Sequence, residues 1–186
     1  MRLPIMKYGD PVLRAKGKRI AKADERIREL ASNMLETMHL ANGVGLAAQQ
    51  VGEALQLTVL DISEVEDRPS TLKIDGREID PVLAMPLVLL NPELTQHGET
   101  VLGPEGCLSF PEIHADIDRA EVVVVQAETL GGGPIKLEAS GLLARALQHE
   151  VDHLNGILFI DRMNSAAKVS LGSRLKRLQK ETQRGR

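Results

Sequence analysis

The chain has 186 residues and a formal net charge of −3, and it is 42% hydrophobic but only 2% aromatic. A chain of this length predicts a single domain, residues 1–186, with a core of aliphatic side chains. No segment approaches the roughly 20 apolar residues of a membrane span, and Met1-Arg2-Leu3-Pro4 does not begin a secretion signal, so we expect a cytoplasmic protein without a membrane partner.

Hydrophobic periodicity divides the chain into predicted helices and strands. Residues 24–41 predict a helix whose apolar face carries Ile27, Leu30, Met34 and Met38. Apolar runs predict strands at residues 57–62, 87–90, 122–125 and 135–139. A polar stretch with a turn at Asp75-Gly76 separates the first two of these strands. Hairpin-type connections and segregated helices favour an α+β fold.

A further helix, which begins after Ser140 and stops at Asn155-Gly156, carries the motif His149-Glu150-Val151-Asp152-His153. Positions i and i+4 lie on one face of a helix, so His149 and His153 can bind one metal ion. Glu150 is rotated away from such a metal, but it can reach a water bound there. The alternative is a pair of buried histidines that bond to backbone carbonyls.

Cys107 is the one cysteine in the sequence, so it cannot form an internal disulfide. A hydrolytic metal needs a third protein ligand and an open position for water. As a thiolate beside two neutral imidazoles, Cys107 would complete such a site. The alternative is a free thiol that acts as a small buried apolar residue. The paired histidines favour the interpretation as a third ligand.

Three segments of the chain resemble the signature motifs of the peptide deformylase family. They are Gly43-Val44-Gly45-Leu46-Ala47-Ala48-Gln49-Gln50, Glu105-Gly106-Cys107-Leu108-Ser109 and Gln148-His149-Glu150-Val151-Asp152-His153-Leu154. Tyr8-Gly9-Asp10-Pro11-Val12-Leu13-Arg14 and Asn91-Pro92-Glu93 extend the likeness, which covers residues 5–165. The resemblance implies antiparallel β-sheets packed around the central H-E-x-x-H helix, with N-terminal and C-terminal helices. Residues 63–86 are longer than this connection usually is in the family, so we interpret them as an insertion that forms a surface hairpin or a subunit contact.

The resemblance also implies an activity. The family removes the N-formyl group from the formyl-methionine of newly synthesised polypeptides and releases formate. Cys107, His149 and His153 would bind one divalent metal ion, most commonly Fe(II) in the family, although Zn, Ni or Co also suit these ligands. The metal-bound water would be the nucleophile, and Glu150 would serve as general base and then general acid.

The remaining motif residues are expected to bind the substrate. Gln50 and the backbone N–H of Leu108 would form the oxyanion site, whereas the alternative for Gln50 is an exposed strand glutamine. Gly43 and Gly45 either form a loop-to-strand turn or also let a peptide pair with the main chain. By resemblance, the apolar pocket for methionine would include Val44, Leu142 and Ala146.

Several charged residues near the motifs are assigned structural roles. Arg145 either lines the cleft or lies at the helix surface, and the solvent-exposed position is favoured. Glu105 is expected to brace its loop through an exposed pair with Arg119 or Arg145, which would contribute little. Asp152 would be a second-shell carboxylate or part of a salt bridge. Two further residues are expected to be isolated at the surface, His39 and His97.

The C-terminal segment from Arg162 is basic, because eight Lys or Arg residues against one acid give +7 and leave −10 for the rest of the chain. Residues 165–186 could dock as an amphipathic helix through Val169, Leu171, Leu175 and Leu178. A solvated basic face is the common explanation for such a run. The resemblance adds possible contact with the ribosome, whose phosphates attract cations, and implies no DNA partner.

Two other functions are compatible with parts of the pattern. One is another H-E-x-x-H metallohydrolase, such as a peptidase, which the Cys107 ligand and the Gln50 motif disfavour. The other is a non-catalytic, ribosome-associated module with a structural metal. A structural site would be closed by a fourth protein ligand, and the motifs suggest none.

Overall fold

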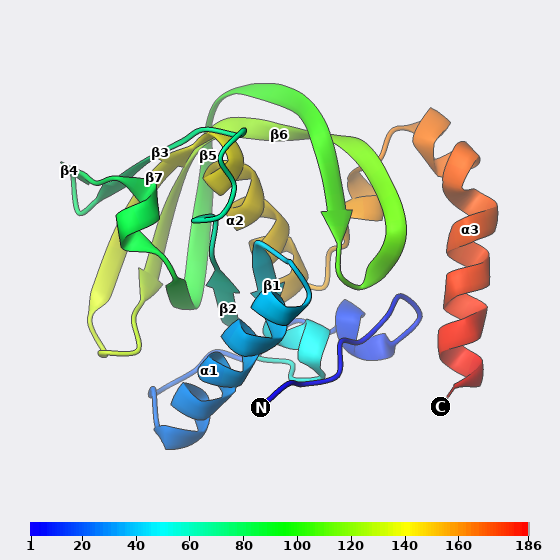
Figure 1. Cartoon of the computed structure of the whole chain (residues 1–186), viewed down its shortest axis with the longest axis horizontal. Coiled ribbons are helices and arrows are strands. Elements are labelled where there is room, and N and C mark those ends of the chain that lie inside the picture. The colour runs from blue at the N-terminus through cyan, green and yellow to red at the C-terminus, as the bar shows by residue number, and fades with distance from the viewer. Residues whose placement is uncertain (186) are drawn as a thin grey trace.

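The computed structural model of the chain describes residues 1–185, so Arg186 of the predicted basic helix lies outside the described residues. The described residues form one antiparallel seven-stranded sheet in the order β1-β2-β5-β6-β7-β3-β4. The strands are β1 (Gly45–Ala47), β2 (Leu57–Leu60), β3 (Ser70–Ile74), β4 (Arg77–Glu78), β5 (Leu87–Cys107), β6 (Phe110–Glu128) and β7 (Pro134–Ser140). The helices are α1 (Glu25–Leu40), α2 (Gly141–Leu154) and α3 (Ser165–Arg184). The α+β class is confirmed, and Figure 1 shows the curved sheet wrapped around the central helix α2.

The hairpin of β5 and β6 dominates the sheet, and it is far longer than the sequence predicts. Pairing begins where Leu90 faces Glu128, passes the apolar run at 122–125 and continues outward until Cys107 faces Phe110 across the tip. The outer half of β5 is mostly exposed and polar, so apolar and polar residues do not alternate along its sequence. Register shifts interrupt the ladder at three places, and Figure 1 shows the hairpin arching over α2.

Helix α1 agrees with the prediction for residues 24–41. The side chain of Asp24 accepts a hydrogen bond from the Ile27 N–H and caps the helix. Ile27, Met34 and Met38 are buried, and Leu30 packs at the edge of the same apolar cluster. This cluster joins α1 to β1 and β2, which positions the glycine-containing segment before Gln50.

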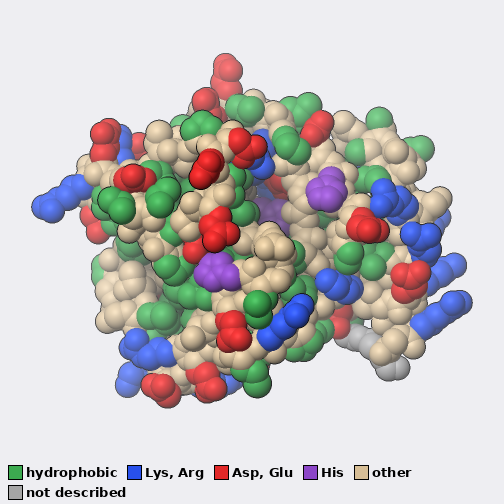
Figure 2. All heavy atoms as spheres, viewed as in Figure 1, with side chains coloured by type: hydrophobic (Ala, Val, Ile, Leu, Met, Phe, Trp, Pro, Cys, Tyr) green, Lys and Arg blue, Asp and Glu red, His purple; other side chains and the backbone are tan. Residues whose placement is uncertain are grey.

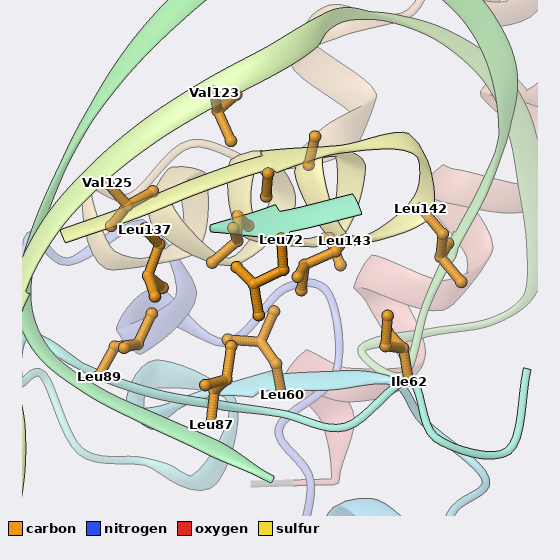
Figure 3. Close-up of a cluster of buried hydrophobic side chains, with 14 of the residues drawn as sticks. Leu60, Ile62, Leu72, Leu87, Leu89, Val123, Val125, Leu137, Leu142 and Leu143 are labelled. Carbon is orange, nitrogen blue, oxygen red and sulfur yellow. The ribbon is translucent and has the colours of Figure 1, made fainter. Parts of the chain in front are cut away.

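Helix α2 begins after Ser140 as predicted, but the Ser140 side chain does not cap it. The Ser140 hydroxyl instead bonds to Thr71 Oγ1 at 2.6 Å, and Ser70 Oγ accepts from the Leu143 N–H at 2.9 Å. The cap therefore comes from β3. One face of α2 packs on the sheet through an aliphatic cluster. Figure 3 shows Leu143 of α2 in this cluster with side chains from several strands, among them Leu60, Leu89, Val123, Val125 and Leu137.

Residues 63–86 form a hairpin that belongs to the sheet. β3 pairs with both β4 and β7, and its Leu72 is 2% exposed within the aliphatic cluster. A short 3-10 turn at Pro81–Ala84 follows. Of the two interpretations of this segment, the hairpin agrees with the structure, although its first strand contributes to the core and is more than a surface feature.

Helix α3 covers the predicted basic segment from Ser165 to Arg184. Leu171, Leu175 and Leu178 pack against a cluster that includes Phe110 and Phe159. The prediction that Val169 helps to dock the helix is wrong, because Val169 is 82% exposed. The helices formed by residues 1–185 include none with the length and apolar character needed to cross a membrane.

Candidate metal centre

The tip of the β5–β6 hairpin and helix α2 bring together the three predicted metal ligands. The ligand atoms of Cys107, His149 and His153 all lie within 4.8 Å of one another. Cys107 Sγ is 3.3 Å from His153 Nε2, and the two imidazole centroids are 4.9 Å apart. The histidines are buried, as the apolar stripe of α2 predicts. Within residues 1–185 their bonding partners are the side chains of Cys107 and Glu105, which does not favour the alternative of bonds to backbone carbonyls.

The donor atoms of these groups suit a divalent ion. Glu105 Oε2 lies 2.9 Å from His149 Nδ1, so Nε2 is the ring nitrogen that can bind a metal ion. Burial and the neighbouring His149 lower the pKa of His153 well below its ordinary value, so its imidazole is neutral. His153 Nδ1 has no protein partner within residues 1–185. A thiol and two imidazoles with available nitrogens match the donor set of a three-ligand metal site.

Glu105 is buried, and the prediction of an exposed ion pair is wrong. It accepts hydrogen bonds from Arg119 at 2.7 and 2.9 Å and from Arg145 at 3.0 Å. Burial alone would raise the pKa of Glu105, but the bonds from Arg119 and His149 outweigh it and hold the pKa at about 2. Glu105 is therefore ionised, and it fixes the orientation of the His149 ring.

Arg145 is also buried, at 8% exposure, which overturns the expectation of a solvent-exposed side chain. Besides Glu105, its guanidinium donates to the carbonyls of Val101 at 2.6 Å and Ile117 at 2.7 Å. The missing side chain of Gly103 provides the space, because a Cβ there would lie 2.9 Å from Arg145 Nη2. The curved hairpin thus supplies acceptors that make burial of the charge favourable.

Asp152 extends this ionic cluster, and of its two interpretations the salt bridge is confirmed. Arg119 Nη1 lies 2.5 Å from Asp152 Oδ2, and Arg162 donates to both carboxylate oxygens at 2.5 and 2.6 Å. A continuous chain of bonds therefore runs from Arg162 through Asp152, Arg119 and Glu105. It ends at the ring of the metal-ligand candidate His149.

Glu150 lies beside the three ligand candidates but is not one of them. Its side chain is buried, and its Oε2 has no protein partner in the part of the chain that is described. Burial raises the pKa of Glu150 to about 7. Gly45 lies against it, because a Cβ at Gly45 would clash with Glu150 Oε1. The glycine therefore makes room for the carboxylate as well as for a turn.

Gln50 is 1% exposed and belongs to the 3-10 turn Ala48–Val51, so it is not an exposed strand residue. Its Oε1 accepts from the Ala47 N–H at 2.9 Å, which fixes the orientation of the amide. Its Nε2 consequently faces the site, 3.2 Å from Ser109 Oγ and 3.5 Å from Cys107 Sγ. A positioned donor at this place can bind developing negative charge on an oxygen.

A pocket of about 460 Å³ opens onto the site. Its lining includes every predicted substrate-binding residue, namely Gly43, Val44, Gly45, Leu142 and Ala146, together with Leu108. Figure 2 shows a hollow near the centre of this face with histidine atoms inside it. The pocket therefore connects Cys107 and His149 with solvent.

Two residues with partners were missed by the sequence analysis. Lys7 lines the pocket and donates to the Leu108 carbonyl at 2.7 Å, and burial lowers the pKa of Lys7. His39 is exposed as predicted, but it is not isolated, because its Nε2 lies 2.9 Å from Asp61 Oδ2. Both contacts join segments that are distant in sequence, so no local sequence pattern predicts them.

An i, i+4 histidine pair with a buried glutamate after the first histidine is the pattern of the H-E-x-x-H metallohydrolases, and here the half-buried Cys107 lies beside that pair. The family profile of polypeptide deformylase matches residues 2–169. The peptide deformylase of Opitutus terrae is 46% identical over 184 residues, which cover 98% of this chain and 95% of that protein. The peptide deformylase of Dictyoglomus thermophilum is 46% identical over 158 residues, covering 85% and 90%.

Solved structures agree with these sequence comparisons. The peptide deformylase of Thermus thermophilus is 38% identical with a TM-score of 0.80, and the match covers 97% of this chain and 99% of that one. A peptide deformylase from Synechococcus elongatus, solved in complex with actinonin, is 40% identical with a TM-score of 0.79, covering 92% and 87%. The chain belongs to the polypeptide deformylase family.

Proposed function

We propose that this protein removes the N-formyl group from formyl-methionyl peptides during their synthesis and releases formate. The observation that carries the proposal is that Glu150, Gln50, Cys107 and His149 line one pocket, while the ligand atom of His153 lies within 4.8 Å of those of Cys107 and His149. Cys107, His149 and His153 would hold the metal, and Fe(II) is the favoured ion for this donor set in the family, with Zn, Ni or Co as alternatives. When bound, the cation supplies Lewis acidity and lowers the pKa of water at the site.

Three groups of the chain would carry out the reaction. Glu150 accepts a proton from the attacking water and delivers it to the departing amine, and its pKa of about 7 suits both steps near neutral pH. Gln50 Nε2 and the Leu108 N–H donate to the oxygen that gains charge as the formyl carbon becomes tetrahedral. Burial of Glu150 and Gln50 keeps bulk water from competing for these bonds.

The pocket supports binding of an extended peptide. β1 pairs with β2 on one side only, and the outer part of β5 pairs only with β6, so two strand edges within residues 1–185 are free beside the pocket. A peptide between them can add its backbone to the sheet. Val44, Leu142 and Ala146 would surround the methionine side chain.

The decisive experiment compares the wild type with Glu150→Gln and Glu150→Ala after anaerobic loading with Fe(II). The wild type should release formate from formyl-Met-Ala-Ser, and both variants should bind metal stoichiometrically yet lose at least about 100-fold in rate. Acetyl-Met-Ala-Ser is the matched substrate control, and metal content is measured for every sample. A wild type that holds metal but releases no formate would overturn the proposal, and cleavage of internal peptide bonds would favour a peptidase.

We further propose that the protein acts in the cytoplasm and that α3 contacts the ribosome. The Lys and Arg side chains of α3 are exposed, whereas Arg162 is bound to Asp152 and is not available. Phosphate binding by exposed cations weakens as salt is raised. Cosedimentation with ribosomes at about 50 and 200 mM salt tests this, and binding that is independent of salt would contradict it.

A further inference from the structure

The two oxyanion donors proposed above belong to different elements, and a stretch near the start of the chain connects them. Gln50 lies in a 3-10 turn, and Leu108 lies at the tip of the β5–β6 hairpin. The Met6 N–H donates to the Gln50 carbonyl at 2.8 Å, and the Tyr8 N–H donates to the Ser109 carbonyl at 2.9 Å. This stretch therefore ties the two donor-bearing segments to each other.

Lys7 lies between these two backbone bonds, and its side chain adds a third bond. Lys7 Nζ donates to the Leu108 carbonyl at 2.7 Å, and the half-buried side chain lines the pocket of the metal centre. A charged donor makes a shorter and stronger hydrogen bond than a neutral one. The ammonium group therefore holds the backbone of the residue whose N–H is needed at the site.

The backbone that carries Lys7 is itself anchored in the core. The Tyr8 ring stacks on Phe110 with centroids 4.9 Å apart, and Phe110 meets Phe159 at 5.1 Å. Both phenylalanines are 1% exposed. A side chain that extends from a fixed backbone can hold its hydrogen-bond acceptor in one orientation, so the bond from Lys7 fixes the Leu108 carbonyl relative to the core.

The orientation of the Leu108 N–H depends on how firmly the rest of this residue is held. Leu108 follows Cys107, the last residue of β5, and its own backbone is not part of the ladder. Its side chain is confined, because a Cβ at Gly43 would lie 2.7 Å from Leu108 Cδ1. Peptide units are planar, so few dihedral angles separate the carbonyl from the N–H of one residue. Fixing the side chain and the carbonyl therefore restricts the direction of the N–H.

We propose that Lys7 is a positioning residue that directs the Leu108 N–H toward the oxygen that gains charge in the reaction. The inference rests on the function proposed above, and it adds a residue that lies outside the three signature motifs. Its effect passes through Leu108. Loss of one oxyanion donor lowers kcat by about 100–1000-fold. A donor that is present but poorly oriented should lower kcat less, by about tenfold or more.

The test measures formate release from formyl-Met-Ala-Ser by the Fe(II)-loaded, full-length protein and three variants. Lys7→Met should lower kcat at least about tenfold and leave KM within about twofold, because only the transition state uses the donor. Lys7→Arg, which keeps a charged donor, should recover most of kcat. Lys16→Met is the matched control, since Lys16 is exposed and does not line the pocket, and it should keep the wild-type kcat.

Metal content and urea denaturation are measured for each variant, and Lys7→Gln replaces Lys7→Met if the latter does not fold, with the same loss expected. Four results would overturn the inference: a Lys7→Met kcat close to that of the wild type, a loss confined to KM, a loss of metal together with kcat, and no recovery in Lys7→Arg. Failure of the proposed function is distinct, because the wild type itself would then release no formate.

Discussion

Replacing Arg119 with methionine should strongly destabilise the fold, because Arg119 is the centre of the buried ionic cluster. Its side chain is 2% exposed and pairs with Glu105 through two bonds and with Asp152 through a third. Methionine keeps much of the volume but leaves one carboxylate on each side with fewer partners. Removing one member of a buried pair typically costs about 3–5 kcal/mol, a large part of the about 5–15 kcal/mol that stabilises a domain.

Urea denaturation of the wild type, Arg119→Met and a surface control measures this loss. The control is Arg19→Met, because Arg19 pairs with Glu128 at 2.7 Å but is 65% exposed. We expect this change to cost at most about 1 kcal/mol. The reasoning is refuted if the two variants lose similar amounts, or if Arg119→Met lies within about 1 kcal/mol of the wild type.

Three further changes test smaller features. Gly45→Ala should displace the buried Glu150 carboxylate beside it and lower the rate of formate release at least about tenfold, with the metal retained. An unchanged rate would show that the added methyl group does not displace Glu150. Ser70→Ala should lower the free energy of unfolding, measured by urea denaturation, by about 1 kcal/mol, and Ser140→Ala should lower it less, because only Ser70 caps α2. Equal losses for the two variants would contradict the assignment of the cap to Ser70. Burial would raise the pKa of Asp161, but the bond from Arg14 outweighs it and lowers the pKa, so this stabilisation is present above pH about 3.9 and is lost as pH falls through the folded pKa. The stability gap between the wild type and Arg14→Met should therefore narrow in acid, and a constant gap would exclude the ion pair as its cause.

The parts of the site that depend on local spacing could be predicted from the sequence. His149 and His153 share a face because α2 is a regular helix, and the lone Cys107 lies at a hairpin tip next to them. The outer half of β5 could not be predicted, because most of its residues are exposed and carry no apolar alternation. Its pairing follows from continuation of the buried inner ladder, which is a property of the two strands together.

The surroundings of the metal-ligand candidates depend on contacts between distant residues. Glu105 and His149 are 44 residues apart, and Glu105 and Arg145 are 40 apart. General behaviour predicts exposed side chains for Arg and Glu, and only the hairpin carbonyls together with the missing side chain of Gly103 reverse this expectation for Arg145. No short window of sequence contains both the charge and its acceptors.

The ionic cluster is better explained by orientation of the site than by stability. A well-packed apolar group of equal volume often stabilises as much as a buried ion pair, and the core cluster between α2 and the sheet is aliphatic. The cluster instead joins the three elements that form the site: Glu105 and Arg119 come from the hairpin, Asp152 from α2 and Arg162 from the turn after it. Because its last bond fixes Nδ1 of His149, loosening the cluster should weaken metal binding by about 10–100-fold even in a variant that remains folded. Glu105→Gln, which keeps the shape of the side chain but removes its charge, separates that effect from packing when metal affinity and unfolding are measured on the same sample.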